Sequence, residues 1–440
     1  MITILAIFIL LIAIYAAIKK PALFILIYTL VGCSIDSFGF VGFISYSTPF
    51  KHYSIYFKVL LILCSAIYSL KYYKQSKKDN YCNIMKLSII TIAAVLLSSL
   101  LIPLKRGFNA KYIGVVIENL SMYSPTIFLI TIGCGQIRKP ISLLKIIVIS
   151  QTVLAFLIIY LRYIGYNYLN FLDGRNYLSS LNYFNYNSQV ATFENYDMLL
   201  GNKYIFSQYG QFHNPNALGF YSGMCLAMTF SDLIKNIKTF WWSIPLIIIS
   251  VLCWINAGTR APIIGLISAI FLSLLFMRKP KKYLLITIII LIAMISISKI
   301  TPFIEYLSVK RDNPSFSGRV ELFKSGINYL SNNFLYGSGG YRDEIIQSEH
   351  IFPHQLFLMK GVLYGFAAML LFFLLVYVYP IKYFIESPNK NFTVTSILCI
   401  LILQSLTNNE TCPALFWIAF STVIMELKKN SILPKNRTTN

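Results

Sequence analysis

Three short segments in the second half of the chain carry the side chains best suited to chemistry on a phosphorylated substrate. They contain Arg260 in Ala-Gly-Thr-Arg-Ala-Pro, Arg319 in Ser-Gly-Arg-Val-Glu, and His354 in Phe-Pro-His-Gln. A guanidinium group donates two parallel hydrogen bonds to phosphate oxygens and keeps its charge at any physiological pH. A neutral imidazole can take the proton of an attacking hydroxyl group, as a general base must. We therefore predict that Arg260, Arg319 and His354 form a catalytic site that acts on a phosphorylated lipid.

Arg260 lies in the very short linker between two hydrophobic segments, which places its guanidinium at or just inside the outer face of the membrane. A charge at that depth is costly, and its default interpretation is functional. The alternative is an arginine that only marks the boundary and extends its head group into water. We favour the functional role, because boundary cations of that kind are expected on the cytoplasmic side.

The other two residues each have a structural alternative. Arg319 lies in a loop whose acidic and basic residues nearly balance, so an ion pair with Glu321 is as good an interpretation as an anion site. His354 follows Pro353, a residue favoured in the first turn of a helix, where the helix dipole helps to keep an imidazole neutral. A histidine that merely caps the helix is the alternative. The presence of two arginines in the same set favours the functional interpretation of His354.

Six further residues are predicted to bind substrate. His213, Asn214 and Asn216 open another hydrophobic segment at the same face, although asparagine and proline are also ordinary helix-start residues. The glycine-rich turn at 336–341 could present backbone amides to a phosphate. No Asp-x-Asp pair, P-loop or histidine–glutamate metal spacing is visible in the sequence, so neither a metal nor a cofactor is predicted. The six predicted binding residues are His213, Asn214, Asn216, Arg311, Lys324 and Tyr341.

The elements that must position these residues are membrane-spanning helices. The chain of 440 residues is 57% hydrophobic and 12% charged, whereas soluble domains are about a quarter charged. Apolar runs of roughly 20 residues recur along its length, and each can cross a bilayer as a helix. We therefore predict an all-α polytopic membrane protein with about 12–13 transmembrane helices. The whole chain, 1–440, is predicted to form a single integral-membrane domain.

The net charge of +22 follows from this topology rather than from a nucleic-acid surface. Lysine and arginine gather in short loops, which the positive-inside rule places in the cytoplasm. No basic face with interleaved aromatic residues appears, so no nucleic-acid partner is expected. The N-terminus is then outside and the C-terminus cytoplasmic. The predicted spans are 2–18, 21–43, 54–70, 87–104, 112–133, 143–161, 214–231, 241–257, 261–277, 283–299, 353–379, 392–408 and 413–427.

Two long loops, 162–213 and 300–352, are predicted on the outer, periplasmic side. The first is rich in tyrosine and asparagine, which fits either a surface loop of biased composition or a carbohydrate-facing surface. In the second, the apolar spacing over 318–330 predicts a short amphipathic helix. We expect this second loop to carry part of the active site. The apolar side of its helix is predicted to be formed by Val320, Phe323, Ile327 and Leu330.

Together these motifs resemble the O-antigen ligase and O-antigen polymerase superfamily of bacterial envelopes. The resemblance covers roughly residues 210–380. It implies a GT-C-like helical bundle and a metal-independent glycosyltransferase of the bacterial inner membrane, acting on undecaprenyl-diphosphate-linked glycans at the periplasmic face. Arg260 and Arg319 would then neutralise the diphosphate leaving group, His354 would orient or deprotonate the acceptor hydroxyl, and single displacement would invert the anomeric carbon. The motifs that carry the resemblance are Asn-Pro-Asn at 214–216, Gly-Thr-Arg-Ala at 258–261, Gly-Arg-Val-Glu-Leu-Phe at 318–323, Tyr-Gly-Ser-Gly-Gly at 336–340, and Pro-His-Gln at 353–355 with Gly361 behind it.

Within this superfamily we predict the polymerase, which adds the growing chain to the next lipid-linked repeat unit. Two long outer loops suit two large lipid-linked glycans, whereas a ligase, which transfers finished chain to lipid A-core, typically concentrates its outer mass in one loop. Ligases commonly show asparagine after the histidine, where this chain has Gln355. A flippase for the same lipid-linked unit is the alternative from another class, and it would place charges around a cavity between repeated halves. The expected partners are lipid-linked oligosaccharides as donor and acceptor, membrane lipids, and a chain-length regulator protein that the resemblance implies.

Overall fold

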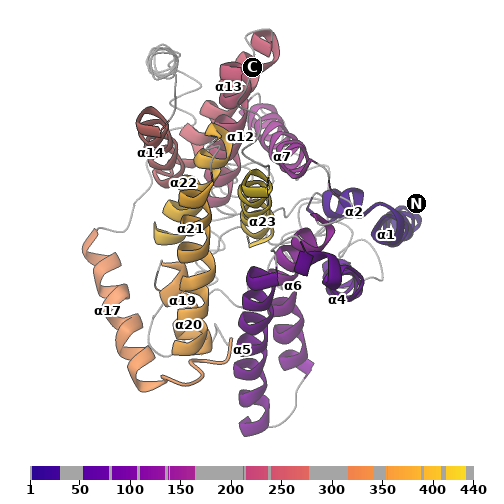
Figure 1. The fold of residues 1–440 in the computed structure, drawn as a ribbon, viewed down its shortest axis with the longest axis vertical. Coiled ribbons are helices and arrows are strands. Elements are labelled where there is room, and N and C mark those ends of the chain that lie inside the picture. Colours follow the sequence, from indigo (N-terminus) through magenta and orange to yellow (C-terminus); the bar gives the residue numbers. More distant parts are fainter. Residues whose placement is uncertain are drawn as a thin grey trace.

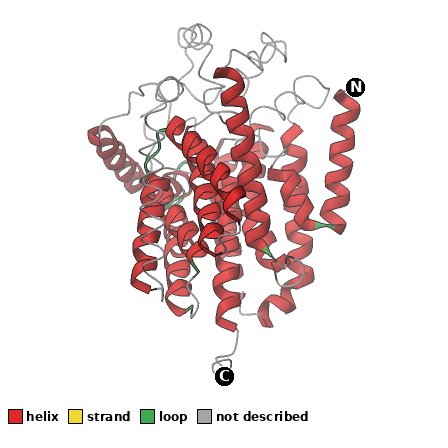
Figure 2. Cartoon of the chain, turned by 90° about the horizontal axis from the view of Figure 1, so that it is seen from above, coloured by secondary structure: helices red, strands yellow, loops and turns green. Residues whose placement is uncertain are grey.

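The protein is a bundle of helices that stand side by side (Figures 1 and 2). The computed structural model describes residues 2–29, 53–78, 82–106, 110–133, 137, 139–163, 212, 215–235, 239–276, 316–340, 353, 355–387, 391–407 and 413–432. None of these residues forms a strand. The fold is therefore all-α, as the apolar composition predicts.

The helices of the N-terminal half are long, except for the short α2, which follows a break at the end of α1. α1 ends at Lys19, and Pro21 begins α2, because proline has no backbone N–H to lose at the first position of a helix. The hydroxyl of Tyr68 on α4 donates to the carbonyl oxygens of Ala17, 2.9 Å away, and Ile18, 3.1 Å away, which satisfies the end of α1. The helices here are α1 (Ile2–Lys19), α2 (Pro21–Ile27), α4 (Tyr53–Lys78), α5 (Cys82–Arg106), α6 (Ala110–Gly133) and α7 (Pro140–Tyr163).

The C-terminal half carries the predicted site. Its first helix, α12, is the most enclosed of the four candidate spans: 89% of its apolar stretch is buried in the protein, against 33–39% for the other three. α12 packs against α7, α13, α14 and α22. The helices are α12 (Pro215–Lys235), α13 (Phe240–Ala257), α14 (Ala261–Phe276), α17 (Phe316–Asn332), α19 (Leu356–Tyr364), α20 (Phe366–Phe373), a π-helical turn η3 (Leu374–Val378), α21 (Tyr379–Glu386), α22 (Phe392–Thr407) and α23 (Pro413–Ile432).

The described helices identify the fold as that of an all-α polytopic membrane protein. Four stretches are long and apolar enough to cross a membrane: Asn83–Leu101, Pro140–Tyr160, Pro215–Lys235 and Phe366–Glu386. The predicted span 283–299, the larger part of 21–43, and most of both long loops lie outside the described residues. The predicted number of spans therefore stays a prediction. Shorter apolar helices cover Thr3–Lys19, Trp241–Ala257, Ala261–Ser273 and Phe392–Thr407.

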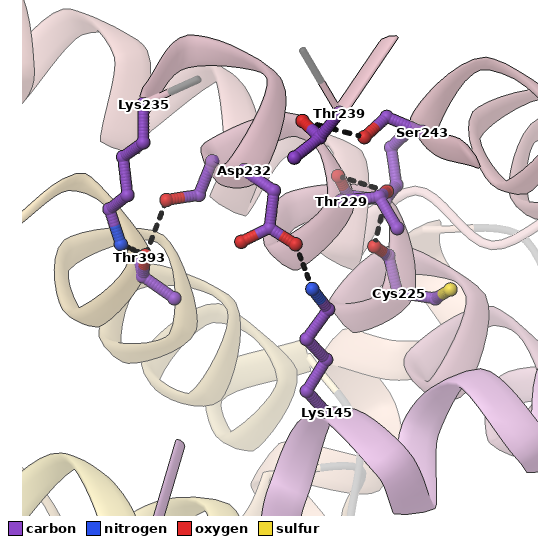
Figure 3. A network of polar contacts seen from close by, with 10 residues as sticks. Lys145, Cys225, Thr229, Asp232, Lys235, Thr239, Ser243 and Thr393 are labelled. Carbon is purple, nitrogen blue, oxygen red and sulfur yellow. Dashed lines mark hydrogen bonds and ion pairs between the residues drawn. The ribbon is translucent and has the colours of Figure 1, made fainter. Parts of the chain in front are cut away.

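Helix ends that were predicted to be cytoplasmic are joined by polar contacts, which Figure 3 shows from close by. Lys145 near the start of α7 forms an ion pair with Asp232 near the end of α12. One turn further along α12, the ammonium of Lys235 donates to the hydroxyl of Thr393 at the start of α22, 3.1 Å away. Ser231 shares a hydrogen bond with the same hydroxyl. These contacts require α7, α12 and α22 to alternate in direction, as their predicted topology does.

The single helix predicted over 353–379 is wrong. The chain forms α19 and then α20, with Gly365 between them in a backbone conformation of φ 87° and ψ 174° that ends the first helix. A positive φ of this kind is accessible to glycine and disfavoured for residues with a side chain. Glycine is frequent in transmembrane helices, so the two glycines of this apolar run, Gly361 and Gly365, give no clear signal of the break in the sequence.

Candidate functional site

Arg260 lies in a three-residue turn whose backbone is held at both ends. α13 ends at Gly258, which has φ 61° and donates its N–H to the carbonyl oxygens of Trp254 and Ile255, 3.0 and 3.1 Å away. The indole N–H of Trp254 donates to the carbonyl oxygen of Thr259, 2.5 Å away. The Arg260 carbonyl accepts the first backbone bond of α14, from Ile264. The turn is therefore fixed relative to α13 and α14.

The side chain of Arg260 is exposed, whereas its neighbour Thr259 is buried. No ion pair to Arg260 occurs within the described part of the chain. Its guanidinium is thus presented to the surroundings with its charge uncompensated there. An arginine in this state has its two parallel donors available for an anionic ligand.

The Arg260 turn rests on the first turns of α12. A Cβ atom added to Gly219 would lie 1.8 Å from the Thr259 hydroxyl oxygen, and one added to Gly223 would lie 2.3 Å from Cβ of Pro262. Only glycine allows the two helices to approach this closely. Residues three and four apart share a helix face, so Asn216 lies on the side of α12 that meets the turn. The structure therefore places the predicted residues Asn216 and Arg260 at one junction.

A second junction brings the helix that carries Arg319 against Pro353 and Leu358. The predicted amphipathic helix is present as α17, slightly longer than 318–330. A Cβ atom on its Gly326 would lie 3.2 Å from Cγ of Pro353 and 3.3 Å from Cδ2 of Leu358. These two residues flank His354 in the chain. Lys324, a predicted binding residue, is exposed on the same helix.

Other predicted site residues cannot be placed in this arrangement. Arg319 belongs to the first turn of α17, and only its backbone is described. The positions outside the described residues are His213, Asn214, Arg311, Tyr341 and His354. Their predicted roles therefore stay predictions. α22 contacts both α14 and α19, so the two junctions belong to one helical unit.

The glycine-rich turn does not offer a row of amides to a phosphate, so that interpretation is wrong. The N–H of Gly337 donates to the Asn333 carbonyl, 2.9 Å away, and that of Gly339 to the Tyr336 carbonyl, 3.1 Å away. The N–H groups of Ser338 and Gly340 are also engaged, each with a carbonyl at the end of α19, 2.9 Å away. A backbone N–H that already donates to a carbonyl is not free to bind an anion.

A buried lysine on α19 was not singled out by sequence reasoning. Lys360 is only 1% exposed, and its ammonium lies 5.4 Å from the ring centroids of Tyr123 and Phe372 and 5.9 Å from that of Tyr364. Rings at these distances attract a cation. The Tyr364 hydroxyl in turn donates to Asn119 on α6. Its sequence context does indicate an unusual residue, because Lys360 is a single charged residue inside an apolar run.

Fold and site together define a polytopic helical membrane protein with an exposed arginine in a rigid turn between two apolar helices. Residues 245–373 match the model of a protein family described as O-Antigen ligase. The matched segment contains Arg260, Arg319 and His354, although it covers less than a third of the chain. The match supports the O-antigen ligase and polymerase superfamily and does not distinguish its two branches. No curated protein matches the chain.

Proposed function

We propose that this protein is a surface-polysaccharide polymerase that transfers glycan from undecaprenyl diphosphate onto the next lipid-linked repeat unit at the periplasmic face. The observation that carries the proposal is the placement of Arg260. Its exposed guanidinium stands in a turn fixed by α13, α14 and the glycine face of α12, within the segment that matches the O-antigen ligase family. A diphosphate is the ligand that best fits such a donor, because a guanidinium binds phosphate oxygens in pairs.

The proposed reaction is a single displacement at the anomeric carbon of the donor glycan. An acceptor hydroxyl attacks this carbon while His354 takes the hydroxyl proton as general base. The bond between the anomeric carbon and the diphosphate oxygen breaks with its electron pair, and undecaprenyl diphosphate leaves. Arg260 and Arg319 stabilise the negative charge that develops on that oxygen, the role that a divalent cation plays in many other transferases. The proton passes from His354 to solvent, and the product is inverted at the anomeric carbon.

The polymerase is favoured by the two long loops predicted on the outer side, 162–213 and 300–352, which would provide extramembrane chain for two large glycans. The second candidate function is that of a ligase, which would transfer the finished chain to lipid A-core. The matching family is described as O-Antigen ligase, and the match supports both branches of the superfamily equally. Both candidates use the same donor and the same three residues, and they differ in the acceptor.

Complementation distinguishes the two candidates. The wild-type gene and the variants Arg260→Ala, Arg260→Lys, Arg319→Ala and His354→Ala would be expressed in polymerase-null and ligase-null strains at matched membrane levels. Lys139→Ala is the control, because Lys139 is an exposed cation at the predicted cytoplasmic end of α7.

We expect the wild type and Lys139→Ala to restore a polysaccharide ladder in the polymerase-null strain, whereas the alanine variants leave a single core-plus-one-repeat band. Arg260→Lys should restore only part of the ladder, because an ammonium keeps the charge and loses the paired donors. Rescue of the ligase-null strain alone would assign the ligase. Wild-type behaviour of all four site variants would reject the site.

A further inference from the structure

The break between α19 and α20 is closed by one segment, residues 333–340, here called the capping turn. In an uninterrupted helix the N–H of Phe366 would donate to the carbonyl of Val362. At this break Phe366 donates instead to the carbonyl of Phe334, 2.8 Å away, and the Val362 carbonyl accepts from Ser338, 2.9 Å away. The next carbonyl of α19 accepts from Gly340, also at 2.9 Å. The capping turn thus satisfies the backbone groups on both sides of the break.

Backbone N–H and C=O groups that lose their helical partner need another partner when they are buried, and the capping turn supplies it here. The fit here also excludes side chains: a Cβ on Gly365 would lie 2.3 Å from the Leu335 carbonyl oxygen, and one on Gly337 would lie 2.4 Å from that of Val362. The rings of Phe334 and Phe366 stack at a centroid distance of 4.7 Å. The break and the capping turn therefore have complementary shapes, and neither has room for a side chain at its glycine.

A third helix holds the capping turn from the other side. The hydroxyl of Ser98 on α5 donates to the carbonyl of Tyr336, 2.7 Å away. α5 also packs against α19 and α20, so the turn is bound to a fixed part of the bundle. Because the capping turn follows directly from α17, these bonds set the position of α17 as well.

The consequence concerns the two predicted catalytic residues that lie on these helices. The capping turn joins the end of α17 to the end of α19, and Gly326 packs α17 against Pro353 near the start of α19. Arg319 lies at the start of α17, and His354 precedes α19. Two helices fixed to each other at two separate points cannot shift independently. The backbones of α17 and α19 therefore keep a constant relative position.

We propose that the capping turn is a positioning device, in which Gly337, Gly365 and Ser98 hold Arg319 and His354 at the spacing that the transfer reaction needs. The role rests on the proposed function, and it predicts loss of turnover without loss of substrate binding. Displacement of a reacting group by about 1 Å can lower a rate by about 10²-fold. Gly337, Gly365 and Ser98 act through the two helices and touch no substrate.

The test combines a distance with a rate. Spin labels would be attached to cysteines introduced at Ile327 on α17 and Leu370 on α20, both exposed positions, in a cysteine-depleted background. Their separation would be measured in otherwise unchanged protein and in Gly365→Ala, Gly337→Ala and Ser98→Ala. Transfer would be measured with undecaprenyl-diphosphate-linked repeat units as substrate. Tyr68→Phe is the matched control, because it also removes a hydroxyl that donates to a backbone carbonyl, at the α1–α2 break.

We expect a single narrow distance in the parent protein and in Tyr68→Phe. In the two glycine variants the distance should broaden, kcat should fall at least about tenfold and KM should stay within about twofold. Ser98→Ala, which preserves the chain fold around the break, should show the same changes with a smaller size. An unchanged distance in Ser98→Ala together with unchanged kcat would overturn the proposal, as would equal losses in Ser98→Ala and Tyr68→Phe. If the parent protein transferred no glycan, the proposed function would fail, and a broadened distance in the variants would still support the mechanical coupling.

Discussion

Replacing Gly219 with alanine tests whether the Arg260 turn is held in place by α12. The new Cβ would lie 1.8 Å from the hydroxyl oxygen of Thr259 and 2.9 Å from its Cβ. Rotation of the threonine side chain relieves the first contact and leaves the second, so the turn itself must move. Restoring an ordinary separation of 3.4 Å from the threonine Cβ, in place of 2.9 Å, moves the turn by about 0.5 Å. Overpacking of this kind costs about 1–3 kcal/mol of stability.

The same movement displaces the neighbouring Arg260, so the transfer rate should fall by about tenfold, because a displacement of about 1 Å can lower a rate by about 10²-fold. Thermal unfolding of purified protein and transfer to a lipid-linked acceptor would be measured for Gly219→Ala, Thr259→Gly and the double variant. Thr259→Gly removes all three threonine atoms that the new Cβ would meet, so the double variant should lose less stability than the two single effects combined. Strictly additive losses, or wild-type stability and rate in Gly219→Ala, would refute the contact as the support of the turn.

Three further predictions concern stability, measured by unfolding of purified variants in detergent. Tyr68→Phe should cost about 1–3 kcal/mol, because it removes the donor to two carbonyls at the end of α1, and no measurable loss would contradict this. Trp417→Ala should cost about 3–5 kcal/mol, because this fully buried ring fills the contact of α23 with α6 and α20; a loss below 1 kcal/mol would show that the neighbours collapse into the space. Asp232→Asn should cost at most about 1 kcal/mol, because its partner Lys145 and Asp232 itself are each about a third exposed, and a loss above 3 kcal/mol would mean that the pair behaves as a buried one.

The spacing of apolar residues over 318–330 predicts the helix of the second long loop correctly. It does not predict how much of the apolar side of that helix is buried. That helix is present as α17, but its apolar side is only partly covered. Leu330 is buried, whereas Val320 and Ile327 are 38% and 45% exposed. Helical spacing shows where an apolar stripe runs, and it does not show which part of the stripe meets a neighbour. One close contact passes through Gly326, where the absence of a side chain admits Pro353.

The glycines of the second half show a limit of prediction from sequence: composition does not tell which partner a glycine-rich turn contacts. A glycine-rich segment at 336–340 fits a phosphate cradle and a helix cap equally well by composition. The partner that decides between them is the broken helix at Gly365, which follows about thirty residues later and looks continuous in sequence. The contact between the turn at 336–340 and the helix break at Gly365 forms only when the chain folds, so the local composition of either segment does not predict it.

The junction of Asn216 with the Arg260 turn was expected only in its general location. Sequence reasoning placed both residues at the outer ends of spans, because their neighbours are apolar on one side and polar on the other. Which two span ends meet depends on close packing, here of Gly219 against Thr259. The same limit applies to Lys360, whose three aromatic neighbours come from α6, α19 and α20.

The most direct test of the central claim is chain extension by purified protein in proteoliposomes, with undecaprenyl-diphosphate-linked repeat units as both donor and acceptor and no lipid A-core present. We predict that wild-type protein converts single repeats into a ladder of longer lipid-linked chains with inverted linkages. Arg260→Ala, folded and inserted to the same extent, should leave the single repeats unchanged. A ladder from Arg260→Ala equal to that of the wild type, or no extension by the wild type, would contradict the account.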